Sequence, residues 1–220
     1  MIPLPLHHTK STMMGCCSKL ICIGCRYANQ RREEELGLDK KCPFCREALP
    51  KTKKEGNKQN MKRVKANDPV AICYEGVQHC KKGHYSRALA SLSKAAELEC
   101  VEAHFKLATL CFSGSVKMDE GKEMYHLEEA AIGGHPMARY NLGWHEFHNG
   151  NVERSVKHMT IAATQGSDEA IKELMNAYKG RLVSKEDLAS ALRAHKAAVD
   201  ATKSPQREEA EVFYRARGLM

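Results

Sequence analysis

Residues 68–202 repeat a pattern of alanines with a period of 32 to 35 residues. The segments DPVA (68–71), CVEA (100–103), HPMA (135–138) and SDEA (167–170) end in alanines that are 32, 35 and 32 residues apart. A second set of paired alanines, at 95–96, 130–131, 162–163 and 197–198, is spaced by 35, 32 and 35 residues. Two independent anchors that hold one period over four units predict a repeat architecture.

Each unit is expected to contain two helices. In the third unit two sets of apolar residues, separated by the break HNGN (148–151), each follow one face of a helix. The first set is Met137, Tyr140, Trp144 and Phe147, and the second is Val152, Val156, Met159 and Ala163. Gly150 in the break suits the left-handed end of a helix. A helix pair of this length cannot bury its apolar face alone, so we expect about four pairs to stack as an α-solenoid.

Most single residues of the repeats are expected to serve packing. We predict that Tyr140, Trp144 and the methionines lie in the core and that the histidines face solvent. The cysteines of this region lack ligand spacing and are interpreted as small apolar packing residues; they are Cys73, Cys80, Cys100 and Cys111.

The repeats resemble the Sel1-like branch of the tetratricopeptide superfamily over about residues 68–202. The segment SGSVKMDEGK (113–122) has Val116, Asp119 and Lys122 where that family's turn has valine, aspartate and lysine, with serines in place of its two glycines. The segments KAAELE and EEAAIGG fit the end of the second helix of a unit. The resemblance implies a scaffold that binds protein partners and carries no chemistry of its own.

Six cysteines lie within thirty residues near the start of the chain. Cys22-x-x-Cys25 and Cys42-x-x-Cys45 are separated by sixteen residues, and Cys16 and Cys17 precede them. A Cys-x-x-Cys turn can place two thiolates on one tetrahedral ion, so the spacing predicts Zn²⁺ binding. Buried structural cysteines are the alternative, which the short polar surroundings disfavour.

The pattern CCSKLICIGC…CPFC resembles the last six ligands of an all-cysteine RING finger, over about residues 13–46. A RING binds two zinc ions in a cross-brace, and on that mapping Cys16, Cys17, Cys42 and Cys45 complete the second site. Cys22 and Cys25 are then half of the first site. The resemblance also implies that Pro43 and Arg46 contact a ubiquitin-conjugating enzyme. The segment after Cys25 would form the short central helix.

Two RING ligands are missing, because no Cys-x-x-Cys precedes Cys16. A truncated start at Met1, a degenerate copy of the module, or recruitment of His7 or His8 would each account for this. The resemblance with half a first site implies that the chain as it stands is a poor ubiquitin ligase.

The positive charge is confined to the first third of the chain. Residues 1–66 contain 15 Lys and Arg against 6 Asp and Glu, whereas the remainder has 20 against 21. The basic segment 51–66 is interpreted as a solvated linker or polar helix rather than a nucleic-acid patch, because no aromatic residues interleave for base stacking. Neither a signal peptide nor a membrane-length apolar run occurs. We therefore expect a cytoplasmic protein, with the nucleus as an alternative.

The predicted organisation is mostly α: a partial RING-like zinc module (1–50), a basic linker (51–67), Sel1/tetratricopeptide-like helical repeats (68–202) and a C-terminal helical tail (203–220). The leading hypothesis is a RING-type ubiquitin ligase, which would position a charged conjugating enzyme without a covalent catalytic residue. The repeats would hold an unknown protein partner. A non-catalytic adaptor with a structural zinc module is the second hypothesis. The third is a single-zinc module that uses Cys22, Cys25, Cys42 and Cys45, with basic surroundings that touch nucleic acid.

Overall fold

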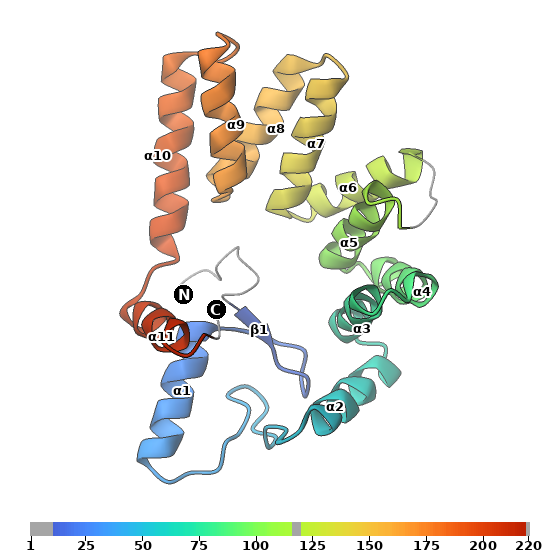
Figure 1. The fold of residues 1–220 in the computed structure, drawn as a ribbon, viewed down its shortest axis with the longest axis vertical. Helices are drawn as coiled ribbons and strands as arrows, with labels where there is room; N and C mark the ends of the chain where they lie inside the picture. Colours follow the sequence, from blue (N-terminus) through green and yellow to red (C-terminus); the bar gives the residue numbers. More distant parts are fainter. Residues whose placement is uncertain (1–10, 116–119, 219–220) are drawn as a thin grey trace. The chain divides into compact units, whose positions relative to one another are not determined.

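The structure, a computed structural model, describes residues 11–115 and 120–218 (Figure 1). The chain divides into two compact units, Met1–Ala71 with Asp200–Met220 and Ile72–Val199, and each is considered by itself. His7, His8, Val116 and Asp119, which the sequence analysis singled out, lie outside the described residues.

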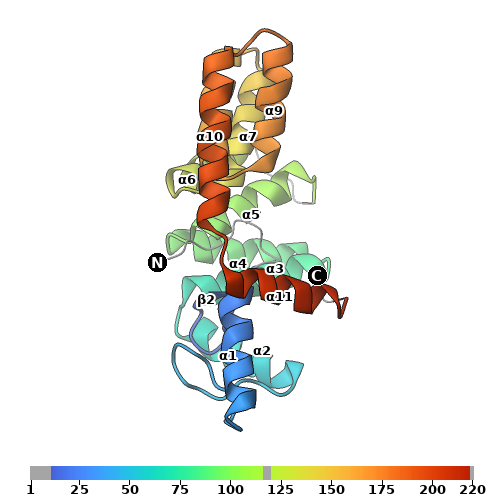
Figure 2. The ribbon, with the colours of Figure 1, turned by 90° about the vertical axis from the view of Figure 1, so that its left-hand side faces the viewer.

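The second unit is a stack of helix pairs, which confirms the expected solenoid of about four repeats. Successive helices contact one another along the stack, from α4 to α9, and α10 closes its end (Figures 1 and 2). The helices are α3 (Pro69–Lys81), α4 (Tyr85–Glu97), α5 (Val101–Phe112), α6 (Glu120–Ile132), α7 (Pro136–His148), α8 (Val152–Thr164), α9 (Asp168–Lys179) and α10 (Lys185–Ala201).

The repeated alanines lie where neighbouring helices meet. The alanine that ends each first anchor is fully buried in all four repeats, at Ala71, Ala103, Ala138 and Ala170. Three of these alanines are followed one turn later by a buried leucine, at Leu107, Leu142 and Leu174. A small side chain is needed at each contact because helix axes can approach closely only where side chains are short. The period that the sequence shows is therefore the period of the helix contacts.

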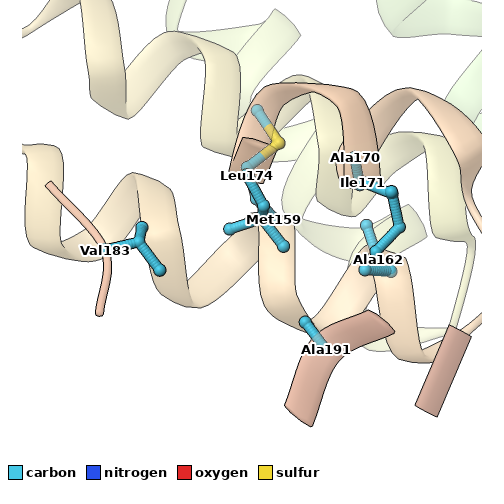
Figure 3. Packing of buried hydrophobic residues seen from close by; sticks show 8 residues of the cluster. Met159, Ala162, Ala170, Ile171, Leu174, Val183 and Ala191 are labelled. Carbon is cyan, nitrogen blue, oxygen red and sulfur yellow. The ribbon is translucent and has the colours of Figure 1, made fainter. Parts of the chain in front are cut away.

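Two glycines of the first and third repeats show how close these helices come. A Cβ built on Gly76 would lie 2.7 Å from Cγ of Leu92, and one on Gly143 would lie 3.0 Å from Cε of Met159. Met159 belongs to the core of the last two repeats, in which it lies beside Leu174 of α9 (Figure 3).

Several packing expectations need correction. Met159 is buried as expected, but Met175 is 43% exposed. Trp144 is 37% exposed and Phe147 is 50% exposed, because both lie at the edge of a groove rather than inside the core. Cys73 is buried as expected, but Cys80, Cys100 and Cys111 are only half-buried. The last alanine pair, 197–198, is not buried, since no fifth repeat packs against it.

Local signals fix several helix ends as predicted. Gly150 follows α7 with a φ of +79° and lets the chain turn out of the helix. Ser184 caps α10, because its hydroxyl accepts a hydrogen bond from the amide of Asp187 at 3.0 Å.

The first unit contains a short hairpin and three helices. The strands β1 (Ser11–Met13) and β2 (Leu20–Cys22) pair antiparallel, with Thr12 opposite Ile21. Helix α1 (Ile23–Glu35) occupies the place of the expected central helix. The basic linker forms a polar helix, α2 (Lys53–Lys65), and the C-terminal tail forms α11 (Pro205–Arg215). The sequence analysis did not foresee the hairpin.

Helix α11 packs against α1, far from it in sequence (Figure 1). The ring of Tyr27 lies 4.8 Å from that of Phe213, measured between centroids, and the hydroxyl of Tyr214 donates to Oε1 of Gln30 at 3.4 Å. These contacts join the two ends of the described chain in one unit.

No helix among the described residues is long and apolar enough to cross a membrane.

Asp68 joins α2 to the start of α3. Its Oδ1 accepts hydrogen bonds from the amides of Val70 and Ala71 at 3.0 and 3.1 Å, and its other oxygen pairs with the guanidinium of Arg63. Burial opposes ionisation, but Arg63 and the Ala71 amide outweigh it and lower the pKa of Asp68 below its usual value. A carboxylate whose pKa is lower in the folded state stabilises the fold at pH values above its unfolded-state pKa. This stabilisation is lost as pH falls through the folded-state pKa.

We therefore expect Asp68→Asn, which keeps the capping oxygen but loses the charge, to destabilise the chain by about 0.5–1 kcal/mol at pH 7. The difference from wild type should begin to shrink as pH falls below about 4, the unfolded-state pKa, and should disappear once pH has passed the lower folded-state pKa, where the wild-type carboxylate is protonated. The free energy of unfolding of each variant is measured by urea unfolding followed by circular dichroism. Asp39→Asn, which changes an exposed aspartate, is the control. An unchanged difference at pH 3 would contradict this account.

Candidate metal centre

Four cysteines converge from two turns of the first unit. Cys16 and Cys17 lie in the hairpin turn between β1 and β2, and Cys42 and Cys45 lie in the turn that follows α1. Each turn is closed by the same type of backbone bond: the amide of Ser18 donates to the carbonyl of Met14, and that of Arg46 to the carbonyl of Cys42. Ser18 and Arg46 both have positive φ values, of 57° and 61°, which reverses the chain after each cysteine pair.

The four sulfur atoms have the spacing of a metal site. All lie within 4.8 Å of one another, with Cys16 and Cys45 at 3.4 Å and Cys17 and Cys42 at 3.8 Å. In a tetrahedral zinc site with Zn–S of about 2.3 Å, the sulfurs would be about 3.8 Å apart. The donor set and its dimensions therefore fit one tetrahedral ion. These are the four cysteines that the cross-brace mapping assigns to its second site, and their role as ligands stays a prediction.

Burial and neighbouring groups shift the pKa of three of these thiols. Burial, followed by hydrogen bonds to Cys45 and Cys42, raises the pKa of Cys16 far above its usual value. Burial also raises the pKa of Cys17. At Cys42 burial acts in the same direction, but the amides of Cys45 and Phe44 outweigh it and lower the pKa. Four adjacent sulfurs can all become thiolates only if a cation is bound among them.

The cluster is part of a very small core. Cys42 is 1% exposed and packs with the buried Met14 and Ile21, while Cys45 is exposed. Helix α2 covers the hairpin turn, since a Cβ built on Gly15 would lie 3.6 Å from the carbonyl oxygen of Gly56. The basic segment therefore packs on the cysteine module instead of extending freely from it.

Cys22 and Cys25 lie outside this cluster. Cys22 is the N-cap of α1, and its sulfur accepts a hydrogen bond from the amide of Cys25 at 3.4 Å. Burial would raise the pKa of Cys22, but the Cys25 amide and the guanidinium of Arg207 lower it. Across the described ranges 11–115 and 120–218, the only group of three or more metal-binding side chains is the four-cysteine cluster. The structure thus brings together four of the six predicted ligands.

Arg207 of α11 is a feature that sequence reasoning missed. It is 7% exposed and donates to the carbonyl of Thr202. A Cβ built on Gly24 would lie 2.7 Å from Cγ of Arg207, so a glycine is required where α1 meets α11. The Ser204-Pro205 sequence is typical of a helix start, but it does not indicate that this helix packs against α1.

Pro43 borders a groove of the first unit. A cavity of about 300 Å³ is lined by Pro43, by Arg26 and Gln30 of α1, and by Met13 of β1. Arg46 is exposed at the end of the same turn. Pro43 and Arg46 thus both lie on the surface of the turn that carries Cys42 and Cys45.

A second groove lies in the repeats. It has a volume of about 270 Å³ and is lined by Trp144 and Phe147 of α7, Val156 of α8 and Leu182 after α9. The Trp144 ring packs on His148, with centroids 3.8 Å apart. These side chains form an apolar surface within the solenoid.

Comparison with solved structures identifies the fold. A Sel1 repeat protein from Oxalobacter formigenes matches with a TM-score of 0.57 at 21% sequence identity, covering 77% of this chain and 52% of that chain. A protective antigen of uropathogenic Escherichia coli displaying an SLR fold matches with a TM-score of 0.53 at 16% identity, covering 86% and 44%. This chain therefore spans about half the length of those structures.

No protein-family model, a RING model included, matches the chain, and no curated protein matches its sequence. The chain therefore has the fold of Sel1-like repeats, together with a four-cysteine cluster that could hold a metal ion.

We expect Cys42→Ser to abolish metal binding by the cluster, because Cys42 is its most buried sulfur. Elemental analysis of the purified protein should show one ion fewer per chain than wild type. Cys80→Ser, which changes a half-buried cysteine of the solenoid, is the matched control and should leave the metal content unchanged.

Chelation should increase the number of reactive thiols while most of the helical circular dichroism persists, since the solenoid is held by apolar packing. Full metal content in Cys42→Ser together with loss in Cys22→Ser would contradict the assignment.

Proposed function

We propose that the chain is a zinc-binding RING-type protein that recruits a ubiquitin-conjugating enzyme and holds a protein partner on its repeats. The observation that carries the proposal is the convergence of Cys16, Cys17, Cys42 and Cys45. Two turns far apart in sequence supply two sulfurs each, in the pairing that the second RING site requires. Cysteine thiolates in a tetrahedral set favour Zn²⁺.

The surface beside the cluster supports recruitment of a conjugating enzyme. Pro43 lines the groove along α1, and Arg46 stands free at the end of the same turn. Bound zinc would fix this turn, because both of its cysteines would be ligands. A ligase of this kind acts through proximity and orientation of the charged enzyme, so no nucleophile is needed.

The repeats would hold the protein partner. The groove around Trp144 and Phe147 offers exposed aromatic side chains in an otherwise packed solenoid. Aromatic residues are common anchors of protein–protein contacts. The partner segment is expected to present an apolar side chain to this groove.

A non-catalytic adaptor is the second candidate, and the surroundings of Cys22 favour it. Its sulfur lies beside the cationic Arg207, and in the described part of the chain it does not belong to a group of three or more metal-binding side chains. One bound ion would stabilise such a module. The module would still lack the complete surface with which a two-zinc RING binds a conjugating enzyme.

The deciding experiment combines the zinc-loaded chain with ubiquitin-charged conjugating enzymes and measures discharge of ubiquitin onto free lysine. We expect slow discharge above background, which Arg46→Ala reduces severalfold without changing the zinc content. Arg31→Ala, an exposed arginine on α1, is the matched control and should retain activity.

Absence of both discharge and binding across a panel of conjugating enzymes would reject the ligase proposal and leave the adaptor. In that case Trp144→Ala should still weaken capture of the repeat partner.

A further inference from the structure

Two histidines of the second helix pair face each other. His104 of α5 is only 9% exposed, contrary to the expectation that the histidines face solvent. Its Nδ1 lies 3.0 Å from Nδ1 of His126, which is half-buried on α6. A histidine nitrogen pair at this distance can share a proton or bind a common cation.

The backbone determines which nitrogen of His104 is available. Its Nε2 lies 3.3 Å from the carbonyl oxygen of Ala96. A carbonyl only accepts hydrogen bonds, so Nε2 carries the proton and Nδ1 of the neutral ring has its lone pair toward His126. Histidines that bind metals commonly donate their other ring N–H to a backbone carbonyl in this way.

The nitrogen separation fits adjacent positions on one ion. Metal–nitrogen bonds of about 2.1 Å at right angles place two nitrogens about 3.0 Å apart, against about 3.4 Å in a tetrahedron. The observed 3.0 Å therefore matches square-planar or octahedral geometry. A small rotation of His126 would turn both lone pairs toward the ion. The proton between the two Nδ1 atoms would leave to solvent while Nε2 of His126 takes one up, so that both rings bind as neutral imidazoles.

A cavity next to the pair provides room and a third ligand. It measures about 910 Å³ and is lined by both histidines, Tyr125, Lys122 and Glu129. Glu129 follows His126 by three residues, so the two side chains share one face of α6. Its carboxylate must rotate inward to bind, since among the described residues only the cysteine cluster has three ligand atoms within 4.8 Å of one another. Lys122 is exposed and can keep its ammonium group in water.

We propose that His104 and His126, with Glu129 as third ligand, form a binding site for a divalent transition-metal ion. Imidazole nitrogens with one carboxylate suit such ions, and three ligands leave coordination positions open toward the cavity. The site is distinct in position and in donor type from the four-cysteine cluster.

The test uses the full chain with zinc in the cysteine cluster and loosely held zinc removed by dialysis. Ni²⁺ is the probe, and after gel filtration nickel and zinc are counted separately by mass spectrometry. We expect one nickel per chain with the zinc content unchanged. His126→Gln and His104→Gln should lose the nickel, and Glu129→Gln should weaken binding severalfold in calorimetric titration. His145→Gln, which changes a half-buried histidine of α7, is the matched control and should bind like wild type.

Circular dichroism is used to check that each variant folds, and His126 is the safer position to substitute because it is only half-buried. Nickel should also raise the Tm of wild type but not that of His126→Gln. Equal nickel uptake by wild type and His126→Gln would overturn the proposal. Nickel uptake matched by zinc loss would also overturn it, because the ion would then occupy the cysteine cluster.

Discussion

The convergence of four sulfurs is the main constraint on the N-terminal module, because its apolar core is very small. The buried members of its apolar cluster are Met14, Ile21 and Cys42. Cys16 and Cys17 of the hairpin turn pack against them. So small a core provides little stability by itself. A bound ion would join the hairpin turn to the turn after α1 and would supply the stability that apolar burial does not. The same linkage would fix the turn that carries Pro43 and Arg46.

The solenoid is stabilised in a different way. Its alanines are buried at each contact between helices, and Gly76 and Gly143 allow a leucine and a methionine to pack directly on the backbone. Each repeat contacts its neighbours along the stack, so stability is distributed over many small apolar contacts. This packing holds the unit together without ligands from the cysteines of the repeats, and it leaves Trp144 partly exposed.

The sequence predicted the features that recur or that have fixed chemical spacing. The alanine period predicted the helix pairs. The cysteine spacing predicted six candidate ligands and allowed Cys22, Cys25, Cys42 and Cys45 as one set, whereas the set that the structure brings together is the one that the RING resemblance implied. It did not predict contacts between segments that lack a pattern, such as Arg207 against Gly24 or His104 against His126. Trp144 was misjudged because helical periodicity identifies a face of a helix but not whether another helix covers that face.

The most direct test of the account is X-ray absorption spectroscopy at the zinc edge of the purified full chain. The account predicts a first shell of four sulfurs at about 2.3 Å, the value typical of zinc thiolates. A zinc ion bound by Cys22 and Cys25 in place of one of the two cysteine pairs would also have a first shell of four sulfurs. The wild-type spectrum is therefore compared with that of Cys22→Ser, and we expect the two spectra to be the same. A shell with nitrogen or oxygen in wild type, or a spectrum altered by Cys22→Ser, would contradict the four-cysteine centre.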